Sequence, residues 1–407
     1  MWKYIKSKIS QFLEVYCREF KLVIHDQGLL IFFLLLPLAY PIVYSLIYNP
    51  EQVRDVKLIV VDHDRSSISR ELVRNLDATQ EAWVIGYAAD LLEARRAMAD
   101  KKCFGILEIP EGFGQKIGRG EQGNAALFCE SSLLLRYRSF LVASTNVSQA
   151  MGAELLTQKI NTVAPLATTI TDGDLMPIEY IPMGNIESGF DSFIMPGVLI
   201  LILQQSIILA AGMAGGAKRE KPELMGYNGV NKAPSVAMTM FGQMMCYATI
   251  IFLPVIYLTH YVPLMFSFPM AGDFLEIIAF LLPMCIASVA LGFCLQGIVW
   301  ERESVFVIWV VTSVIFLFLS GLTWPRYAMS PFWHFVSDCV PATWGVEGFI
   351  RMNANGASLS QVHNDYIHLW ILAGVYLVLA YCVQRWVVRP SLFKGSDAYA
   401  EAKRRAI

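Results

Sequence analysis

The sequence predicts a polytopic α-helical membrane protein with six transmembrane helices, an amphipathic N-terminal elbow helix and an inserted α/β extracytoplasmic domain. Three observations support this fold class. The 407 residues are 55% hydrophobic and 16% charged, with a mean hydropathy of +0.48, whereas soluble domains carry about 25% charged residues. Several apolar segments are long enough to cross a bilayer. Residues 49–188 instead alternate β-rich runs with helical patterns, which is typical of an α/β domain.

The first 25 residues predict an amphipathic helix and not a signal peptide. Large apolar side chains recur at helical spacing: Trp2, Ile5, Ile9, Phe12, Leu13, Tyr16 and Phe20. Charged and polar residues fall elsewhere on the helical wheel. We expect residues 1–25 to lie in the cytoplasmic membrane interface as an elbow helix that leads into the first transmembrane helix, residues 26–48.

Six apolar segments are predicted to span the membrane, because a spanning helix needs about 20 mostly apolar residues. They are residues 29–47, 193–213, 236–257, 274–299, 305–322 and 369–387. Asp191 and Glu276 lie close to two of the ends, so those bounds are approximate. The last five of these spans fall in residues 189–407, which form the second part of the membrane region.

Basic residues near the spans predict the orientation. They gather before the first span, between the second and third, at Arg302, and in a basic tail after the last span. The connection from residue 261 to residue 272 has none. Both termini and the basic tail are therefore expected in the cytoplasm, and residues 49–188 outside. A long loop is translocated regardless of its charge, so the basic residues of that region do not oppose this orientation.

The outer region is predicted to fold as a small domain with a largely parallel sheet. Its strands are expected at residues 56–62, 82–88, 103–110 and 125–131. Ser67 and Asp90 are the expected N-caps of the first two helices between them. A long helix is expected from residue 133 to residue 160, followed by an irregular linker.

Cys103 and Cys129 lie in this polar region and are the one pair that could form a disulfide. Two buried free thiols are the alternative. Cys246, Cys285 and Cys294 fall inside apolar runs and are expected to be small core residues.

The order of several motifs resembles a known family. "VVDHDRSSISRELVRNL" and "FGILEIPEGFGQKIGRGE", with the strand and long helix after them, look like the outer domain of bacterial ABC-2 type (type V exporter) permeases. "HDQGLLIFFLLLPLAYPIVYSLIY" is similar to their first span and "FIMPGVLILILQ" to the start of their second. "LSGLTWPRYAMSPFWHFVSDCVPATWGVEGFIRMNANG" looks like the segment after their fifth span. The resemblance covers nearly the whole chain.

The resemblance implies the permease subunit of an ATP-driven ABC exporter in a bacterial inner (plasma) membrane. Such a permease moves a hydrophobic or amphipathic substrate, such as a drug or lipid, out of the cytoplasm or inner leaflet by alternating access. The family pairs two permeases, identical or paralogous, over separate ATPase subunits. A large outer domain also implies a periplasmic adaptor and an outer-membrane duct.

The chain itself has no G-x-x-x-x-G-K-[ST] motif for binding nucleotide phosphates. No cofactor, metal or catalytic residue is therefore expected in this chain, and ATP and Mg²⁺ are expected in the partner ATPase. The net charge of −2 does not indicate a nucleic-acid partner.

The charged stretch at residues 212–226 is expected to transmit work from the ATPase. In the resembled family this loop holds a short coupling helix, and Arg219 and Glu220 match the family's Arg-Glu pair. The Gly-Thr pair that usually follows is missing, and Pro222 suits the first turn of a short helix instead. Ordinary anchoring of the spans by basic residues is the alternative. The residues assigned to ATPase coupling are Lys218, Arg219, Glu220, Glu223, Glu301, Arg302 and Glu303.

Polar residues within spans usually face an interior. Gln204 and Gln205 lie midway along the second span, where a neutral amide could also join two helices by a hydrogen bond. In the resembled family the second and fifth spans line the cavity between the two permeases. The residues assigned to the substrate pathway are Met195, Gln204, Gln205, Phe316 and Phe318.

The segment after the fifth span, from about residue 323 to residue 365, is broken by prolines. Non-helical backbone at membrane depth must be buried in protein or line water. The resemblance implies short re-entrant helices there, which seal the outer side of the pathway.

Two other functions stay open at this point. A membrane metal hydrolase could use His334 and Asp338, which share a helical face, together with His363, Asp365 and His368. No His-Glu-x-x-His motif supports it, and His363 and His368 are wrongly spaced for one face. The other alternative is a non-ATP receptor or scaffold whose outer domain binds a partner. Copurification with an ATPase subunit discriminates between transport and these readings.

Overall fold

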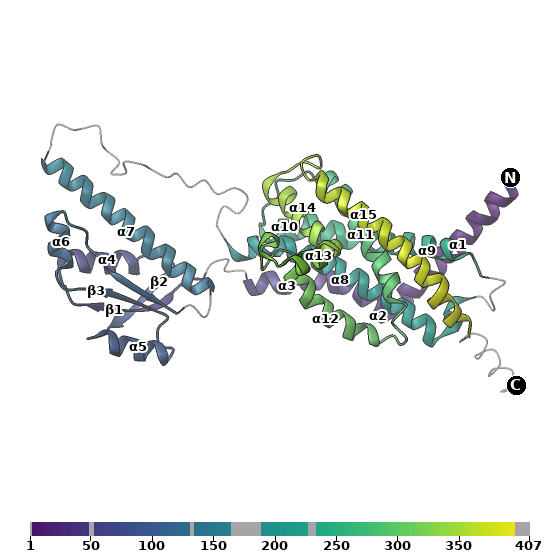
Figure 1. Cartoon of the computed structure of the whole chain (residues 1–407), viewed down its shortest axis with the longest axis horizontal. Coiled ribbons are helices and arrows are strands. Elements are labelled where there is room, and N and C mark those ends of the chain that lie inside the picture. Colours follow the sequence, from purple (N-terminus) through teal and green to yellow (C-terminus); the bar gives the residue numbers. More distant parts are fainter. Residues whose placement is uncertain (1, 49–52, 131–133, 164–188, 227–232, 395–407) are drawn as a thin grey trace. The chain divides into compact units, whose positions relative to one another are not determined.

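The computed structural model describes residues 2–48, 53–130, 134–163, 189–226 and 233–394. The chain divides into two compact units. The membrane unit contains Met1–Asn49 and Pro182–Ile407, and the α/β unit contains Pro50–Ile181. Figure 1 labels the elements of both. The end of the basic tail and most of the expected linker before the second span lie outside the described residues.

The α/β unit contains a four-stranded sheet in the order β2-β1-β3-β4. Its strands are β1 (Val56–Asp62), β2 (Ala82–Tyr87), β3 (Gly105–Ile109) and β4 (Ala126–Cys129). β1 pairs in parallel with β2 and β3, and β4 runs antiparallel to β3. The continuous apolar run of β1 forms an inner strand, because only a strand covered on both faces buries side chains of both parities. The sheet is largely parallel, as predicted.

Helices cover both faces of this sheet (Figure 1). α4 (Ser67–Asp77) and α7 (Leu134–Val163) pack on one face, where Leu58, Val60 and Phe140 are buried. α5 (Leu91–Ala99) packs on the other face, over Val61 and Ile106. Alternate residues of β1 therefore enter different cores, which is the period expected of a strand. The short α6 (Phe113–Arg119) follows β3.

The predicted cap of α4 is wrong by one residue. Ser66, not Ser67, has the extended N-cap conformation, and its hydroxyl accepts a hydrogen bond from the Ser69 N–H at 3.1 Å. Ser67 is already the first helical residue, and the Arg70 N–H three positions after it bonds to the Ser66 carbonyl at 3.3 Å instead of to the Ser67 side chain. Asp90 caps α5 as predicted and accepts from the Glu93 N–H at 2.7 Å.

Cys103 and Cys129 are free thiols in the structure. Cys103 belongs to the core beneath α5, whereas Cys129 packs with the core beneath α4 and α7. The sheet separates the two side chains, so the alternative of two free thiols is the one observed. Burial raises the pKa of both thiols above the ordinary value, which makes them poor nucleophiles.

Asp64 joins the loop after β1 to the start of α6. Its carboxylate accepts a hydrogen bond from the Gly114 N–H at 2.9 Å. A hydrogen bond from the Ser66 hydroxyl, with further bonds from the α6 backbone, holds the pKa of Asp64 below its ordinary value despite the opposing effect of burial.

We expect Asp64→Asn to remove a pH-dependent contribution to the stability of the α/β unit. A carboxyl with a depressed folded pKa stabilises the fold above its unfolded pKa, and this contribution is lost as pH falls through the folded pKa. The protection factor of the Gly114 amide in hydrogen exchange should therefore fall below about pH 4 in the wild type. In Asp64→Asn this protection factor should already be lower at neutral pH, and it should depend less on pH. An unchanged neutral exchange rate would show that this contact contributes nothing.

Five described helical segments of the membrane unit are long and apolar enough to cross a membrane: Gln27–Tyr48, Phe190–Glu220, Val236–Phe266, Phe274–Leu295 and His363–Lys394. The predicted fifth span is the shorter α12 (Ser304–Leu319), with 16 residues. At about 1.5 Å per residue it is about 24 Å long, less than the hydrocarbon core of about 30 Å. Its helical part ends three residues before the predicted limit because the chain turns at Gly321, where φ is +86°.

Several spans are composite helices. The first contains α2 (Gln27–Leu30), the π-helical turn η1 (Ile31–Leu35) and α3 (Leu36–Tyr48). The third joins α9 (Val236–Ile256), η4 (Tyr257–Tyr261) and α10 (Val262–Phe266). A proline follows each π-helical turn within two residues. Such turns accommodate the loss of the backbone hydrogen bond that proline, which has no N–H, cannot donate. The remaining spans are α8 (Phe190–Glu220), α11 (Phe274–Leu295) and α15 (His363–Val383), which η6 (Gln384–Val388) extends.

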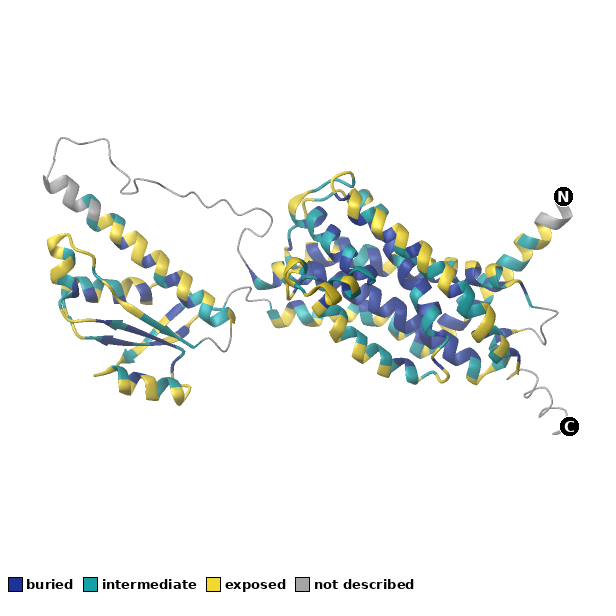
Figure 2. Ribbon diagram, viewed as in Figure 1, coloured by how far each residue is buried: buried dark blue, intermediate teal, exposed yellow. Residues whose placement is uncertain are grey.

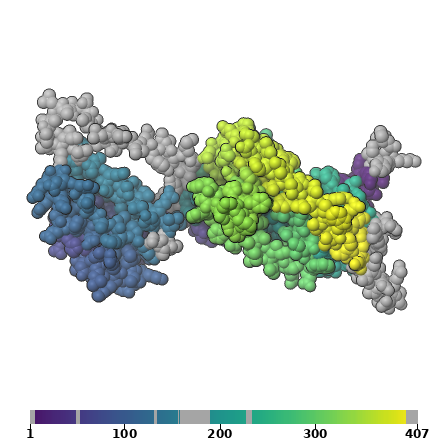
Figure 3. Space-filling view, in the orientation of Figure 1, coloured from purple at the N-terminus to yellow at the C-terminus, as the bar shows by residue number. Residues whose placement is uncertain are grey.

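α8 lies in the interior of the membrane unit and is buried over most of its length (Figure 2). It contacts α3, α11, α12 and α14 (Pro341–Asn355). Small residues at its packed surfaces allow this close approach. A Cβ on Gly216 would lie 2.8 Å from the backbone Cα of Arg302, and Gly292 of α11 meets the Ala211 Cβ of α8. α12 to α15, green to yellow in Figure 3, cover the visible face of this unit.

The N-terminal segment forms one helix, α1 (Trp2–His25), as predicted. It packs along α9, where the Phe12 and Phe241 ring centroids are 5.4 Å apart and the Tyr16 hydroxyl donates to Thr249 Oγ1 at 3.1 Å. The buried stripe includes Val15, Glu19, Leu22 and Val23, whereas Ile9 and Leu13 of the predicted apolar face are exposed. The elbow position at the membrane surface stays a prediction.

Candidate functional site

Six charged side chains meet at one end of the membrane unit, and we call this group the charged junction. Its members are Glu19, Asp26, Lys218, Arg219, Glu220 and Arg302. They come from α1, the start of the first span, the end of α8 and the turn between α11 and α12. Three are acids and three are bases, so the formal charges of the group sum to zero.

The buried centre of the charged junction is Glu19. Lys218 Nζ lies 2.6 Å from its carboxylate. Glu19 is 4% exposed and Lys218 is 7% exposed. The Tyr247 hydroxyl and the Gln243 amide, both on α9, also donate to this carboxylate. A buried charge is tolerated when it is paired and its lone pairs are satisfied. Glu19 therefore locks α1 to α8 and α9.

Arg302 ties the turn between α11 and α12 to two other elements. Its guanidinium pairs with Asp26, and its backbone N–H donates to Glu220 Oε1 at 2.6 Å. Asp26 in turn caps α2 by accepting from the Gly28 N–H at 3.0 Å. The beginning of the first span, the end of α8 and this turn are thus joined through one residue, which uses its side chain for Asp26 and its backbone for Glu220.

The Arg219 side chain makes contacts within the protein instead of extending into solvent. Its guanidinium donates to the Val299 carbonyl and lies 4.9 Å from the centre of the Trp300 ring. Lys218 and Arg219 are consequently structural partners of the α1 and α11 ends, which the charge pattern alone did not predict.

The predicted short helix at Pro222 is present as the 3₁₀-helix η2 (Pro222–Met225). Arg18 of α1 holds it by donating to the Met225 carbonyl at 2.6 Å. Four acids are exposed on η2 and the adjoining turns: Glu220, Glu223, Glu301 and Glu303. This exposed surface, with Lys221, is what a docking partner could reach; residues 227–232 lie outside the described part. A role of the seven assigned residues in coupling stays a prediction.

Three of the predicted pathway residues are buried within the bundle of this chain. Met195 and Gln204 are 0% exposed and Gln205 is 5% exposed. The amides of both glutamines and the Ser206 hydroxyl have no hydrogen-bond partner among the described residues. Three unpartnered polar groups in succession on α8 are costly in an apolar interior, so they form a polar level within an otherwise apolar stretch of this helix.

The two pathway residues on α12 lie elsewhere. Phe316 packs against the core of the membrane unit, whereas Phe318 is 56% exposed. Phe318 lines an open apolar cavity of about 530 Å³ together with Ile315, Trp324, Met329 and Trp333. This cavity does not include the other four predicted residues, so the structure does not bring the five together.

The segment after α12 folds into η5 (Arg326–Ala328), α13 (Pro331–Asp338) and α14 (Pro341–Asn355). Arg326 is its centre: the guanidinium pairs with Asp338 and Glu347 and lies 4.2 Å from the centre of the Trp344 ring. The Ser337 hydroxyl donates to the Leu319 carbonyl at 2.8 Å, which fixes α13 to the end of α12. The short helices agree with the expected segment, and its re-entrant position stays a prediction.

The residues of the metal-hydrolase alternative have other partners. His334 lies 3.3 Å from Asp338, which already pairs with Arg326. Asp365 pairs with Arg351 at 3.1 Å, and the His368 ring stacks on Trp344 at 4.1 Å. In the described ranges no group of three His, Cys, Asp or Glu side chains is placed to hold a metal ion.

A family model described as ABC-2 family transporter protein matches residues 28–382. The chain belongs to this family. The ABC-2 match extends from the first span through the α/β unit to α15. A search of curated proteins gives no match.

Membership makes this ABC-2 permease a multi-pass membrane protein and the membrane subunit of an ABC transporter. The family is not itself catalytic and in general works with an ABC ATPase. The α/β unit between the first two spans fits the inserted domain expected from the sequence.

Sequence reasoning missed the partners that hold the charged junction together. Glu19, Asp26, Gln243 and Tyr247 were not singled out. Glu19 carried a detectable signal, because an acidic residue between Tyr16 and Leu22 falls on an apolar helical face. A buried carboxylate on such a face needs a basic partner, and no local pattern says which one.

Proposed function

We propose that this ABC-2 permease is the membrane half of an exporter that moves a hydrophobic or amphipathic molecule out of the cytoplasm or inner leaflet. A separate ATPase would supply the work at the end of the bundle that holds the charged junction. Six spans, an elbow helix and cytoplasmic termini in a bacterial inner membrane complete the proposal.

The charged junction is the observation that carries it. Arg302, Asp26 and Glu220 connect three separate helix ends, and Glu19 with Lys218 adds α1. A push on η2 or on the turn at residues 301–303 would reach the buried α8 directly. Packed helices with charged ties move as bodies, which suits rocking between inward- and outward-open states.

A second permease, identical or paralogous, would pack beside α12. This helix buries only Val305 and Leu319, and exposes Val307, Val310, Val311 and Val314. The substrate pathway would run between the two copies, with Phe318 at its edge. Gln204 and Gln205 would become accessible when α8 shifts, since their amides lack partners in the present arrangement. A periplasmic adaptor and an outer-membrane duct are further proposed partners.

The exposed acids predict that the partner presents a basic groove. We expect Glu223→Lys combined with Glu301→Lys to abolish most copurification of the ATPase subunit from native membranes. Both side chains are exposed, so the fold should remain intact. The measurement is the yield of bound ATPase, with ATP-dependent transport in vesicles as the second readout.

Glu111→Lys supplies the control, because it makes the same kind of charge reversal, at a single exposed position of the α/β unit. It should leave the copurified ATPase unchanged. If the double variant retains full ATPase binding and transport, the docking surface lies elsewhere. If the wild-type chain copurifies with no ATPase and remains active, the receptor or scaffold function is favoured.

A further inference from the structure

The α/β unit contains a hollow of its own, separate from every residue assigned to transport. It lies between α4, α6, α7 and the segment that joins α6 to β4, and its volume is about 660 Å³. Small-molecule sites typically have about 300–1,000 Å³. All its lining residues belong to one compact unit.

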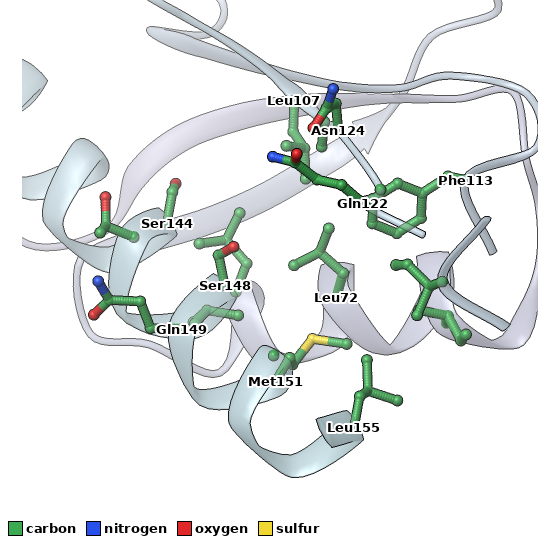
Figure 4. Close-up of a pocket in the computed structure, with 18 of the residues that line it drawn as sticks. Leu72, Leu107, Phe113, Gln122, Asn124, Ser144, Ser148, Gln149, Met151 and Leu155 are labelled. Carbon is green, nitrogen blue, oxygen red and sulfur yellow. The ribbon is translucent and has the colours of Figure 1, made fainter. Parts of the chain in front are cut away.

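The wall of the hollow is apolar and its edge is polar. Leu72, Leu107, Phe113 and Met151 contribute hydrocarbon and sulfur surface from four elements. Figure 4 shows Gln122 and Asn124 on one side and Ser148 and Gln149 on the α7 side, with Leu72 between them. An apolar wall with a few polar groups is the usual design of a site for a small amphipathic molecule.

One polar group in this wall lacks a partner. The Ser144 hydroxyl lines the hollow, is buried from solvent, and has no hydrogen-bond partner among the described residues. A buried hydroxyl without a partner costs free energy, which a ligand hydroxyl or carbonyl would recover. The Ser144 hydroxyl is therefore free to bond to a polar group of a ligand once its side chain turns toward the hollow.

The charges of the lining select the kind of polar head. Glu121 is the single charged residue among those that line the hollow, and none is basic. A carboxylate or phosphate would find no cation there and would meet the Glu121 carboxylate. An uncharged hydroxyl, amide or carbonyl head is compatible with the serine and amide side chains.

We propose that this hollow binds a small uncharged amphiphile, with its apolar body against Leu72, Phe113 and Met151 and its polar head near Ser144 and Ser148. The site belongs to the α/β unit alone, so it does not depend on the proposed direction of transport or on the ATPase. A protein segment is the competing occupant, and the test below separates the two.

Gly152 of α7 offers a way to fill the hollow without disturbing the fold. It lines the hollow, and a Cβ at this position would meet nothing within 4 Å. Its backbone is helical, where leucine is favoured over glycine. Gly118 of α6 also has nothing within 4 Å but does not line the hollow. Gly152→Leu and Gly118→Leu are therefore matched variants.

The experiment uses the full chain in lipid nanodiscs with two photoactivatable probes, diazirine-bearing decanol and its decanoic-acid counterpart. Labelled peptides are mapped by mass spectrometry, and excess unlabelled decanol tests saturation. We expect decanol to label α7 and the α6–β4 segment saturably in the wild type and in Gly118→Leu. Gly152→Leu should reduce this labelling by about tenfold or more, since losing the burial of two methylene groups alone has that effect.

Hydrogen exchange of β1 and β3 amides checks that each variant is folded. Ser148→Trp, at the exposed edge of the hollow, is a second variant that should block the site. Labelling of Gly152→Leu and Ser148→Trp at the wild-type level would overturn the site. Equal labelling by decanoic acid would overturn the uncharged class. Absence of saturable labelling in the wild type would favour a protein segment over a small amphiphile.

Discussion

Lys218→Met is expected to destabilise the membrane unit by about 3–5 kcal/mol, because it leaves the Glu19 carboxylate buried without its cation. Glu19 is 4% exposed, and its remaining partners are the neutral Tyr247 and Gln243. The midpoint of thermal unfolding in nanodiscs should fall markedly, and α1 should lose protection in hydrogen exchange. This is the largest effect expected from any single substitution in the charged junction.

Two further variants show whether the buried charge is the cause. Lys221→Met removes an exposed lysine three residues away and should leave the unfolding midpoint almost unchanged. Glu19→Gln combined with Lys218→Met removes both charges and should recover a large part of the loss, since a neutral buried pair costs less than a lone charge. Equal destabilisation by the double variant would mean that packing, not charge, links α1 to α8.

Gly216→Ala is expected to cost about 1–3 kcal/mol of stability and to weaken transport, because it overpacks a backbone contact. The new methyl group would lie 2.8 Å from Arg302 Cα and 2.9 Å from Arg302 N. Neither atom belongs to a flexible side chain, so the turn must move away from α8. The contacts of Arg302 with Asp26 and Glu220 should be lost with it.

The matched control is Gly374→Ala on α15, where a Cβ would meet nothing within 4 Å. That variant should be as stable as the wild type or slightly more so, since alanine is the better helix former. Thermal unfolding and hydrogen exchange near the charged junction compare the two. Gly216→Ala with wild-type stability and wild-type protection of the turn at Arg302 would contradict the close approach.

The sequence predicted the features that depend on neighbours along the chain. Apolar runs located the five long spans, because burial in lipid requires a continuous length of apolar side chains. The helices nevertheless extend up to nine residues beyond the predicted bounds, as the third span does at Phe266. The run at Val56–Asp62 predicted a strand, and the Asp90 cap was correct because a cap bonds to an N–H two or three residues away. Ser66 in place of Ser67 shows the limit of this local reading when two serines are adjacent.

The sequence predicted where the charged residues of the candidate site lie along the chain, but not which residues they contact. The sequence placed charges at residues 218–220 and 301–303, and the match to the ABC-2 family covers both. When only the neighbouring sequence is considered, Lys218 and Arg219 look like basic residues that are exposed to solvent. Tertiary structure instead pairs Lys218 with a residue 199 positions away and Arg302 with one 276 positions away. Such pairings depend on which helix ends meet in space.

By itself, the sequence determined that this chain is a membrane protein with an inserted α/β domain, since hydropathy and local periodicity are properties of contiguous residues. Only the tertiary structure decided that the charged end of α8 is largely neutralised from within, that Gln204 and Gln205 are buried, and that α4, α6 and α7 enclose a hollow. Each of these arises where surfaces remote in the chain come together, and shape and charge balance at such places are set by three-dimensional packing.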